Sequence, residues 1–232
     1  AVFGPRDARV TVVTFTGFEC PYSKRIYPLL TKLQEEYPYD VRIHIKHKPL
    51  PFHENSRATA EAALCAREQG KFTEMADLLF ERQGQLAGPR KADNEPVHQG
   101  PGVHLPEEDP PAAEPVTTAV WRQLAGEVGL NVNQFATCMS EGKYDGQIDH
   151  DLLVASEAEV VGSPHTFVNG RSIRGAQPWK NWSALVDKEL AAAQAILAES
   201  GLRGEALKAR VFGLYEELIS NGQRKRAIGS KS

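Results

Sequence analysis

Cys20 is the residue of this sequence with the clearest capacity for covalent chemistry. It lies in the motif Cys20-Pro-Tyr-Ser23, and apolar residues recur at helical spacing from Ile26 to Leu33, so we expect the cysteine at the N-terminus of a helix. Pro21 fits the first turn of a helix, where no backbone N–H is needed. The unpaired N–H groups and the helix dipole at this position favour a thiolate, which is the nucleophilic form. The alternative, that Cys20 is only a small buried apolar residue, stays open on spacing alone.

A β-α-β unit is predicted to position this cysteine. Residues 9–15 form a β-branched, apolar run that ends before Gly17, as expected of a strand in a sheet covered on both faces. Residues 41–45 alternate like a second strand, and the length of the crossover favours a parallel pair.

The remainder of the sequence predicts a block of helices followed by a hairpin. Helical spacing runs over 55–82 with a break at Gly70, and again over 120–128, 135–139 and 146–160. Strands return at 164–168 and 171–174, joined by the two-residue turn Asn169-Gly170, and a helix follows at 179–197. Strands at both ends of the chain with helices between them indicate one sheet interrupted by a helical insertion.

The composition of the chain argues against nucleic-acid binding and against a membrane span. The 232 residues carry a net charge of −3, with 41% apolar and 25% charged residues, which is typical of a globular protein and gives no basic face for nucleic acid. No apolar run reaches the ~20 residues that span a bilayer, so no membrane span is expected, and residues 1–8 do not resemble a signal peptide. Residues 84–118 are rich in proline and poor in large apolar side chains, which predicts a loop that is either a solvated spacer or a partner-binding flap.

Five blocks of the sequence resemble the DsbA-like branch of the thioredoxin fold, over roughly residues 4–195. They are 18–22 (FECPY), 49–53 (PLPFH), 65–72 (CAREQGKF), 162–164 (GSP) and 175–178 (GAQP). The resemblance implies an α/β thioredoxin-like fold in which 1–48 and 160–198 form a discontinuous thioredoxin-like domain. It further implies a helical insertion over 49–159, and the sequence adds a C-terminal helix and basic tail over 199–232. The implied activity is that of an oxidoreductase performing disulfide exchange on protein thiols in the periplasm or another extracytoplasmic compartment.

Ser23 departs from the family, which has its second redox-active cysteine at this position. A dithiol enzyme releases its substrate when the second thiol resolves the mixed disulfide, so net dithiol oxidase turnover is expected to be absent here. Three interpretations stay open: a natural monothiol for isomerisation or glutathione-linked exchange, an engineered Cys-to-Ser substitution that traps mixed disulfides, and a non-redox function. The Ser23 hydroxyl is expected either to reach back toward the sulfur or to be solvated in the first helical turn.

The resemblance also implies roles for residues around the cysteine. Pro164 is expected to form a cis peptide bond and to face Cys20, while Ser163, Pro21 and Tyr22 line the substrate groove. His165 is expected to be structural; the alternative is that it faces the groove and stabilises the thiolate.

Two further cysteines, Cys65 and Cys138, lie in the helical region. Each is either an inert buried thiol or, as in some relatives, half of a structural disulfide, which leaves Cys20 as the reactive thiol. No His, Asp, Glu or Cys set has the spacing of a closed metal site, so no metal is expected, and no cofactor beyond glutathione as a co-substrate. The expected partners are protein or peptide thiols and disulfides and a redox partner protein. The alternatives are a peptide-binding module without turnover and a glutathione-dependent isomerase or transferase.

Overall fold

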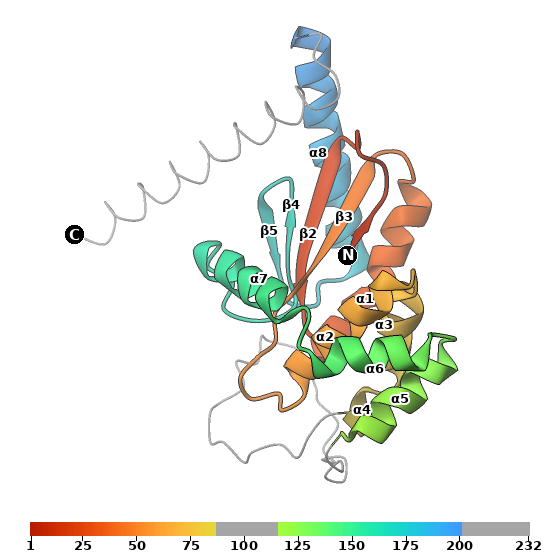
Figure 1. Cartoon of the computed structure of the whole chain (residues 1–232). Coiled ribbons are helices and arrows are strands. Elements are labelled where there is room, and N and C mark those ends of the chain that lie inside the picture. Colours follow the sequence, from red (N-terminus) through yellow and green to blue (C-terminus); the bar gives the residue numbers. More distant parts are fainter. Residues whose placement is uncertain (87–115, 201–232) are drawn as a thin grey trace, which may run out of the picture. The chain divides into compact units, whose positions relative to one another are not determined.

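The computed structural model describes residues 1–86 and 116–200, and the chain divides into two compact units (Figure 1). Of the described residues, the sheet unit holds 1–16, 22–46 and 158–200, and the helical unit holds 17–21, 47–86 and 116–157. This division groups Gly17–Pro21 with the helices, although the strand before and the helix after these residues belong to the sheet unit. The predicted C-terminal helix and basic tail after residue 200, and residues 87–115 of the predicted loop, lie outside the described residues.

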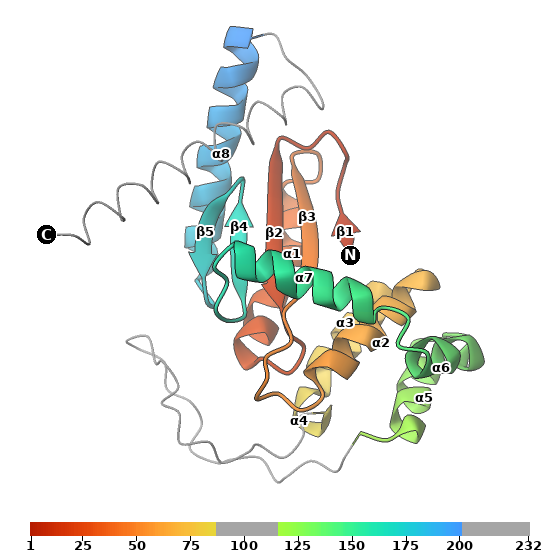
Figure 2. The same cartoon turned by 60° about the vertical axis from the view of Figure 1, so that its left-hand side comes forward.

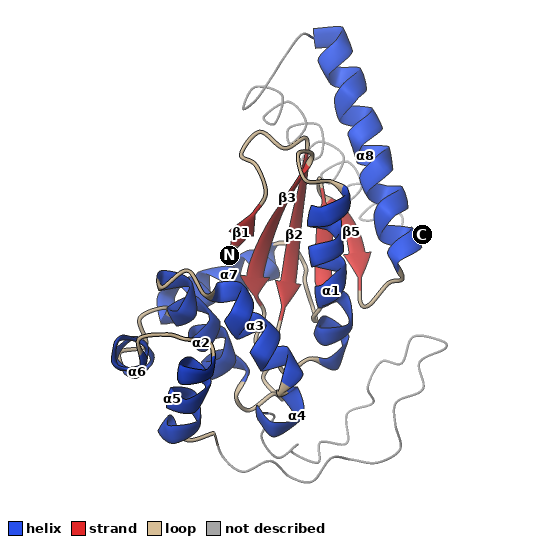
Figure 3. Ribbon diagram, turned by 90° about the vertical axis from the view of Figure 1, so that its right-hand side faces the viewer, coloured by secondary structure: helices blue, strands red, loops and turns tan. Residues whose placement is uncertain are grey.

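The sheet unit is built on a five-stranded sheet of order β1-β3-β2-β4-β5 (Figure 2). Its strands are β1 (Val2–Phe3), β2 (Val10–Thr16), β3 (Val41–His47), β4 (His165–Val168) and β5 (Arg171–Arg174). β1 pairs antiparallel with β3, and β4 pairs antiparallel with both β2 and β5. The arrows of β2 and β3 run in the same direction in Figure 3, as the β-α-β order predicts.

The central strand β2 explains the apolar run at the start of the sequence. Val10 and Val12 are fully buried, and so is Thr14, whose hydroxyl pairs with that of Thr166 on β4 at 2.9 Å. A buried hydroxyl needs such a partner, because an unpaired one would be costly to remove from water. The pairing therefore lets two threonines lie at the centre of the sheet.

The turn between β4 and β5 has the predicted two-residue form. Asn169 and Gly170 have φ values of 45° and 82°, the left-handed conformations that this tight hairpin requires. The Asn169 side chain accepts a hydrogen bond from the Thr11 N–H at 2.8 Å and donates one to the Arg9 carbonyl oxygen at 3.3 Å. The turn is thereby tied to the beginning of β2.

Helices α1 (Pro21–Glu36) and α8 (Trp179–Ser200) cover one face of this sheet, as Figure 3 shows. α8 packs on β2 and β4. The Tyr37 hydroxyl, just after α1, donates to Asp187 of α8 at 2.8 Å, and the Lys32 ammonium lies 4.5 Å from the centre of the Trp179 ring. These contacts hold the two helices side by side.

The helical unit contains α2 (Ser56–Glu68), α3 (Phe72–Glu81), α4 (Gln83–Leu86), α5 (Thr118–Glu127), α6 (Val132–Ser140) and α7 (Asp145–Glu157). α2 is its central element and contacts α3, α6 and α7. The single-turn α4 corrects the prediction of a loop from residue 84, because 84–86 are helical. α7 ends three residues before the predicted Val160.

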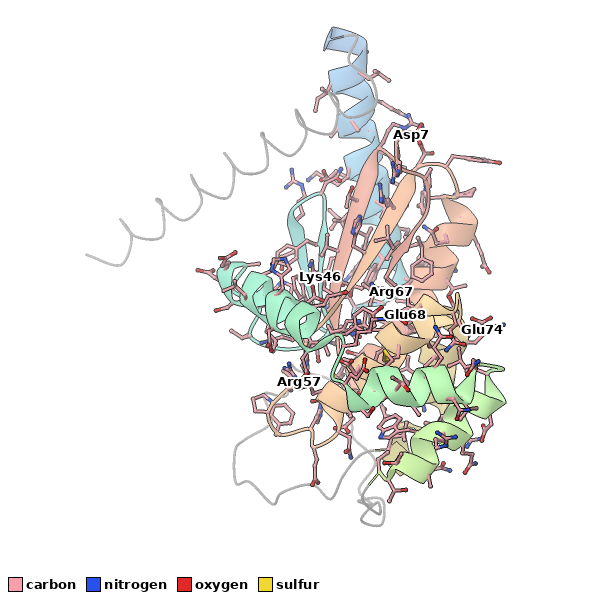
Figure 4. The ribbon with its side chains drawn as sticks, viewed as in Figure 1. Asp7, Lys46, Arg57, Arg67, Glu68 and Glu74 are labelled. Atoms are coloured by element: carbon pink, nitrogen blue, oxygen red, sulfur yellow. A yellow bond between two sulfur atoms is a disulfide. The ribbon has the colours of Figure 1, made fainter. Side chains whose placement is uncertain are left out.

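A disulfide joins α2 to α6. Cys65 and Cys138 are bonded, with their Cα atoms 5.9 Å apart, and the bond lies in the part of the helical unit where these two helices pack together (Figure 4). Cys20 is outside this disulfide and keeps its thiol. Ala60, Leu64 and Ile148 form a buried apolar cluster between α2 and α7.

From this disulfide we predict the number of reactive thiols and a contribution to the free energy of unfolding. Protein prepared without reductant should react with one maleimide per chain in denaturant, and with three after reduction. Replacing both Cys65 and Cys138 by alanine should lower the free energy of unfolding by up to ~4 kcal/mol, because the bond restricts a long loop in the unfolded chain. Urea denaturation followed by circular dichroism measures the change. Equal stability of the double variant and the oxidised protein would contradict this account.

Candidate functional site

Cys20 ends the short turn between β2 and α1. Its N–H donates to the carbonyl oxygen of Gly17 at 3.1 Å, and α1 begins at the next residue, Pro21, so the cysteine lies at a helix N-terminus as its spacing predicts. Only 3% of its surface is exposed. Cys20 is therefore a buried residue at the start of the helix.

The turn that carries Cys20 is fixed by residues of the helical unit. The Phe18 ring lies 4.9 Å from the ring of Phe80 on α3 and 6.0 Å from that of His47, measured between centroids. The Phe18 carbonyl oxygen accepts a hydrogen bond from the Gln83 side chain of α4 at 2.6 Å. The side chain and the backbone of Phe18 are thus held by different elements, and the position of the next residues follows from both.

Glu19, directly before the cysteine, is a buried carboxyl group that the sequence analysis missed. Its Oε1 accepts the Asn55 N–H at 2.8 Å, and 5% of the residue is exposed. Burial raises the pKa of Glu19 to about 7; the hydrogen bond from Asn55 opposes this shift, and the nearby Glu54 adds to it. The sequence signal for this group was the acidic residue Glu19 in the otherwise uncharged block 18–22. The site therefore contains a group that exchanges a proton near neutral pH next to the thiol in sequence.

The residues after Cys20 differ in accessibility. Pro21 is exposed, Tyr22 is partly exposed, and Ser23 is fully buried in the first turn of α1. The alternative of a solvated serine at position 23 is therefore wrong. Pro21 and Tyr22 offer surface that a bound peptide can contact.

At the start of β4, Ser163 and Pro164 are joined by a cis peptide bond. The Pro164 carbonyl oxygen accepts a hydrogen bond from the Gly175 N–H, which follows β5, at 2.9 Å. Pro164 is buried and Ser163 is partly exposed. The end of the β4–β5 hairpin thus fixes the backbone directly after this bond.

His165 is bound within the sheet. Its Nε2 lies 2.7 Å from the Ser172 hydroxyl on β5, and its ring stacks on Phe167 with the ring centroids 4.7 Å apart. Burial, and then the charge of Arg174, lower the pKa of His165 below its ordinary value, so the ring is neutral near pH ~7. A neutral ring does not supply the positive charge required by the thiolate-stabilising interpretation.

Within the sheet unit the structure therefore brings Ser163, Pro164 and His165 to one end of β4, and it places Ser23 in α1. Cys20 and Pro21 lie in the helical unit. Within the described residues, no helix is both long enough and apolar enough to cross a membrane.

Comparison with known proteins gives matches in sequence and in structure. A family model described as "Thioredoxin" matches residues 1–188. The Na(+)/H(+) antiporter NhaA 3 of Salinispora tropica is 32% identical over 83% of this chain and 25% of its own length. NhaA 1 of Salinispora arenicola is 31% identical over 82% of this chain and 24% of its own length. The chain thus spans about a quarter of the length of these curated relatives.

Among solved structures, oxidised BdbD from Bacillus subtilis has a TM-score of 0.63 at 21% identity, covering 82% of this chain and 92% of that chain. A Wolbachia pipientis α-DsbA1 variant has a TM-score of 0.63 at 14% identity, covering 84% and 92%. The catalytic domain of Proteus mirabilis ScsC has a TM-score of 0.54 at 22% identity, covering 82% and 88%. These likenesses show the fold: α/β, thioredoxin-like, with a helical insertion.

The raised pKa of Glu19 predicts a pH dependence of stability. Below about pH 4.5 the carboxyl is protonated in both the folded and the unfolded state, and its contribution to stability is fully present. This contribution is lost as the pH rises through about 7, because the folded protein holds the proton longer than the unfolded chain. Relative to Glu19→Gln, the free energy of unfolding should fall by about 2 to 3 kcal/mol between about pH 5 and about pH 8.

Urea denaturation of both proteins across this range gives the difference, in which the other titrating groups cancel. Parallel pH profiles of the two proteins would show that Glu19 titrates like an ordinary exposed carboxyl.

Proposed function

This chain belongs to the DsbA-like thioredoxin family of thiol–disulfide oxidoreductases, and we propose that it exchanges disulfides with protein thiols through Cys20 alone. The observation that carries the proposal is a thiol at the N-terminus of α1 followed in the first turn by a buried hydroxyl, Ser23, instead of a second thiol. The helix N-terminus stabilises negative charge on the sulfur, which is needed for attack on a disulfide.

The proposed reaction stops at a mixed disulfide. The Cys20 thiolate attacks one sulfur of a substrate disulfide; that S–S bond breaks, a new bond to Cys20 forms, and the leaving sulfur takes up a proton. Because Ser23 cannot attack this new bond, release requires a thiol from outside the motif. A second thiol of the same substrate gives isomerisation without net oxidation. Two small thiols of the glutathione class give reduction of the substrate disulfide: the first releases the substrate thiol and takes its place on Cys20, and the second releases Cys20 as the thiol and forms a small-molecule disulfide. An engineered origin of Ser23 predicts the same trapping, since the chemistry depends on the residue present.

We assign the peptide-contacting roles by family resemblance. Ser163 and the cis-bonded Pro164 are proposed to receive an extended peptide, with Pro21 and Tyr22 contributing exposed surface. His165 is proposed to support β4 through Ser172 and Phe167. The proposed compartment is extracytoplasmic, which is supported by the Cys65–Cys138 disulfide, since structural disulfides persist where the environment is oxidising.

Mass spectrometry of the full chain incubated with a disulfide-containing peptide tests this function. We expect a covalent peptide adduct on Cys20 that persists until a small thiol is added, because no resolving thiol follows in the motif. Ser23→Cys should release the adduct and oxidise a dithiol peptide at least ~10-fold faster than the unaltered chain. Cys20→Ala is the control and should form no adduct.

Two results would count against the proposal. If the unaltered chain oxidises the dithiol peptide as fast as Ser23→Cys, another cysteine resolves Cys20. If Cys20→Ala retains the peptide as well as the unaltered chain does, and neither forms an adduct, the protein is a binding module without turnover.

The curated relatives suggest a second candidate function. They are Na(+)/H(+) antiporters in which the matching segment is about a quarter of the protein, and the matches cover 83% and 82% of this chain. On this ground we propose that the chain works together with such an antiporter. In vesicles carrying the Salinispora tropica relative without its matching segment, adding this chain should change the Na⁺-dependent proton flux. Loss of the effect in Cys20→Ala would tie it to thiol chemistry, and an unchanged flux with both proteins would remove this candidate.

A further inference from the structure

A second group of chemically active side chains lies inside the helical unit. Glu61 and Cys65 are one turn apart on α2, and Cys138 reaches them from α6; a carboxylate oxygen and the two sulfurs all lie within 4.8 Å of one another. The three residues are 5%, 1% and 4% exposed. Because residues at i and i+4 share a helix face, Glu61 and Cys65 present their polar atoms to the same space.

Only one of the two carboxylate oxygens of Glu61 has a hydrogen-bond partner. Its Oε1 accepts the Tyr144 N–H at 2.8 Å and lies 3.9 Å from the Cys65 sulfur. Its Oε2 is buried and has no hydrogen-bond partner. Burial raises the pKa of Glu61; the hydrogen bond from the Tyr144 N–H and the charge of Arg57 oppose this shift, and the charge of Asp145 adds to it.

The charge of Arg57 acts on Glu61, but this guanidinium is shared with two other carboxylates. The Arg57 guanidinium is already bound by Asp145 at 2.7 Å and by Asp149 at 2.8 Å. A buried carboxylate oxygen that lacks a hydrogen bond is costly. The cost is understandable if this oxygen serves a ligand in another state of the protein.

We propose that Glu61, Cys65 and Cys138 form a redox-gated site that binds a divalent, thiophilic cation of the zinc type after the disulfide is reduced. Two thiolates and one carboxylate are ligands that Zn²⁺ accepts in tetrahedral sites, with water in the fourth position. The site is independent of Cys20 and goes beyond the proposed exchange activity. In the oxidised protein the sulfurs are bonded to each other and are not thiolates, so the site does not exist.

Reduction of the disulfide precedes binding of the cation. A dithiol reductant attacks the Cys65–Cys138 bond, is itself oxidised to a disulfide, and passes two electrons and two protons to the two cysteines. The cation then displaces both thiol protons into solvent and forms two metal–sulfur bonds and one metal–oxygen bond. With Zn–S bonds of about 2.3 Å at the tetrahedral angle, the sulfurs must lie roughly 3.7 Å apart. Rotation of the two side chains allows this while the Cα atoms stay 5.9 Å apart.

The structural role of Glu61 can be separated from metal binding. Its Oε1 holds the N–H of Tyr144, the residue before α7, and the amide oxygen of glutamine can accept the same hydrogen bond. Glu61→Gln therefore keeps the support of α7 and removes the charged ligand. Glu68→Gln is a matched control on the same helix (Figure 4), since Glu68 pairs with Lys143 at 2.6 Å.

Cobalt titration of the full chain tests the proposal. In a Cys20→Ala background, which removes the third thiol, protein reduced with a phosphine should bind one Co²⁺ per chain with a thiolate-to-cobalt charge-transfer band, and Zn²⁺ should displace it. The oxidised protein should show no such band. Glu61→Gln should weaken Co²⁺ binding by ~10-fold or more, and Glu68→Gln should leave it unchanged.

Thermal unfolding provides the second measurement. Zn²⁺ should raise the melting temperature of the reduced protein and not that of the oxidised protein. The proposal is overturned if the reduced protein binds no Co²⁺, if Glu61→Gln binds it with unchanged affinity, or if the oxidised protein binds equally well. It is also overturned if reduction abolishes the helical signal and Zn²⁺ does not restore it.

Discussion

The attachment of the Cys20 turn to the helical unit is the constraint on which the chemistry of this protein depends. The turn leaves the end of a central strand and enters a helix of the sheet unit, yet its contacts are with α3, α4 and the segment before α2: Phe18 with Phe80 and Gln83, and Glu19 with the Asn55 N–H. The helical insertion therefore sets where the sulfur lies. A change in the packing of α3 or α4 would act on the nucleophile without touching the motif itself.

Three buried carboxyl groups link separate segments of the helical unit by accepting backbone N–H groups. Glu19 accepts the N–H of Asn55 before α2, Glu61 that of Tyr144 before α7, and Asp151 that of His47 at the end of β3, at 2.8 to 2.9 Å. Each bond joins residues at least 36 positions apart in the chain. By accepting a backbone N–H, each carboxyl group fixes the end of one element against another. The same burial raises the pKa of Glu19 and Glu61, so the hydrogen bonds of these two residues depend on their protonation.

The sequence predicted the parts of the fold that depend on local patterns. Alternation in β3, the positive-φ preference of Asn169-Gly170, and Pro21 after Cys20 each act within a few residues, and the structure has the expected elements there. β1 could not be predicted, because two residues carry no periodicity, and neither could α4, whose QGQL sequence is polar and adjoins a proline-rich segment. The partners of Glu19 and Glu61 were missed for a different reason. They are fixed by helix packing between distant segments, although the Glu61–Cys65 spacing of one helical turn was visible in the sequence.

The bond between Cys65 and Cys138 also gives the chain an unusual connectivity. It closes residues 65–138 into a covalent ring, with the entry and exit Cα atoms 5.9 Å apart. A single proteolytic cut anywhere inside this ring opens it without dividing the molecule, so the nicked protein still migrates as one species unless it is reduced. The α2–α6 junction likewise survives such a cut, because it is held by a covalent bond that does not pass through the intervening backbone.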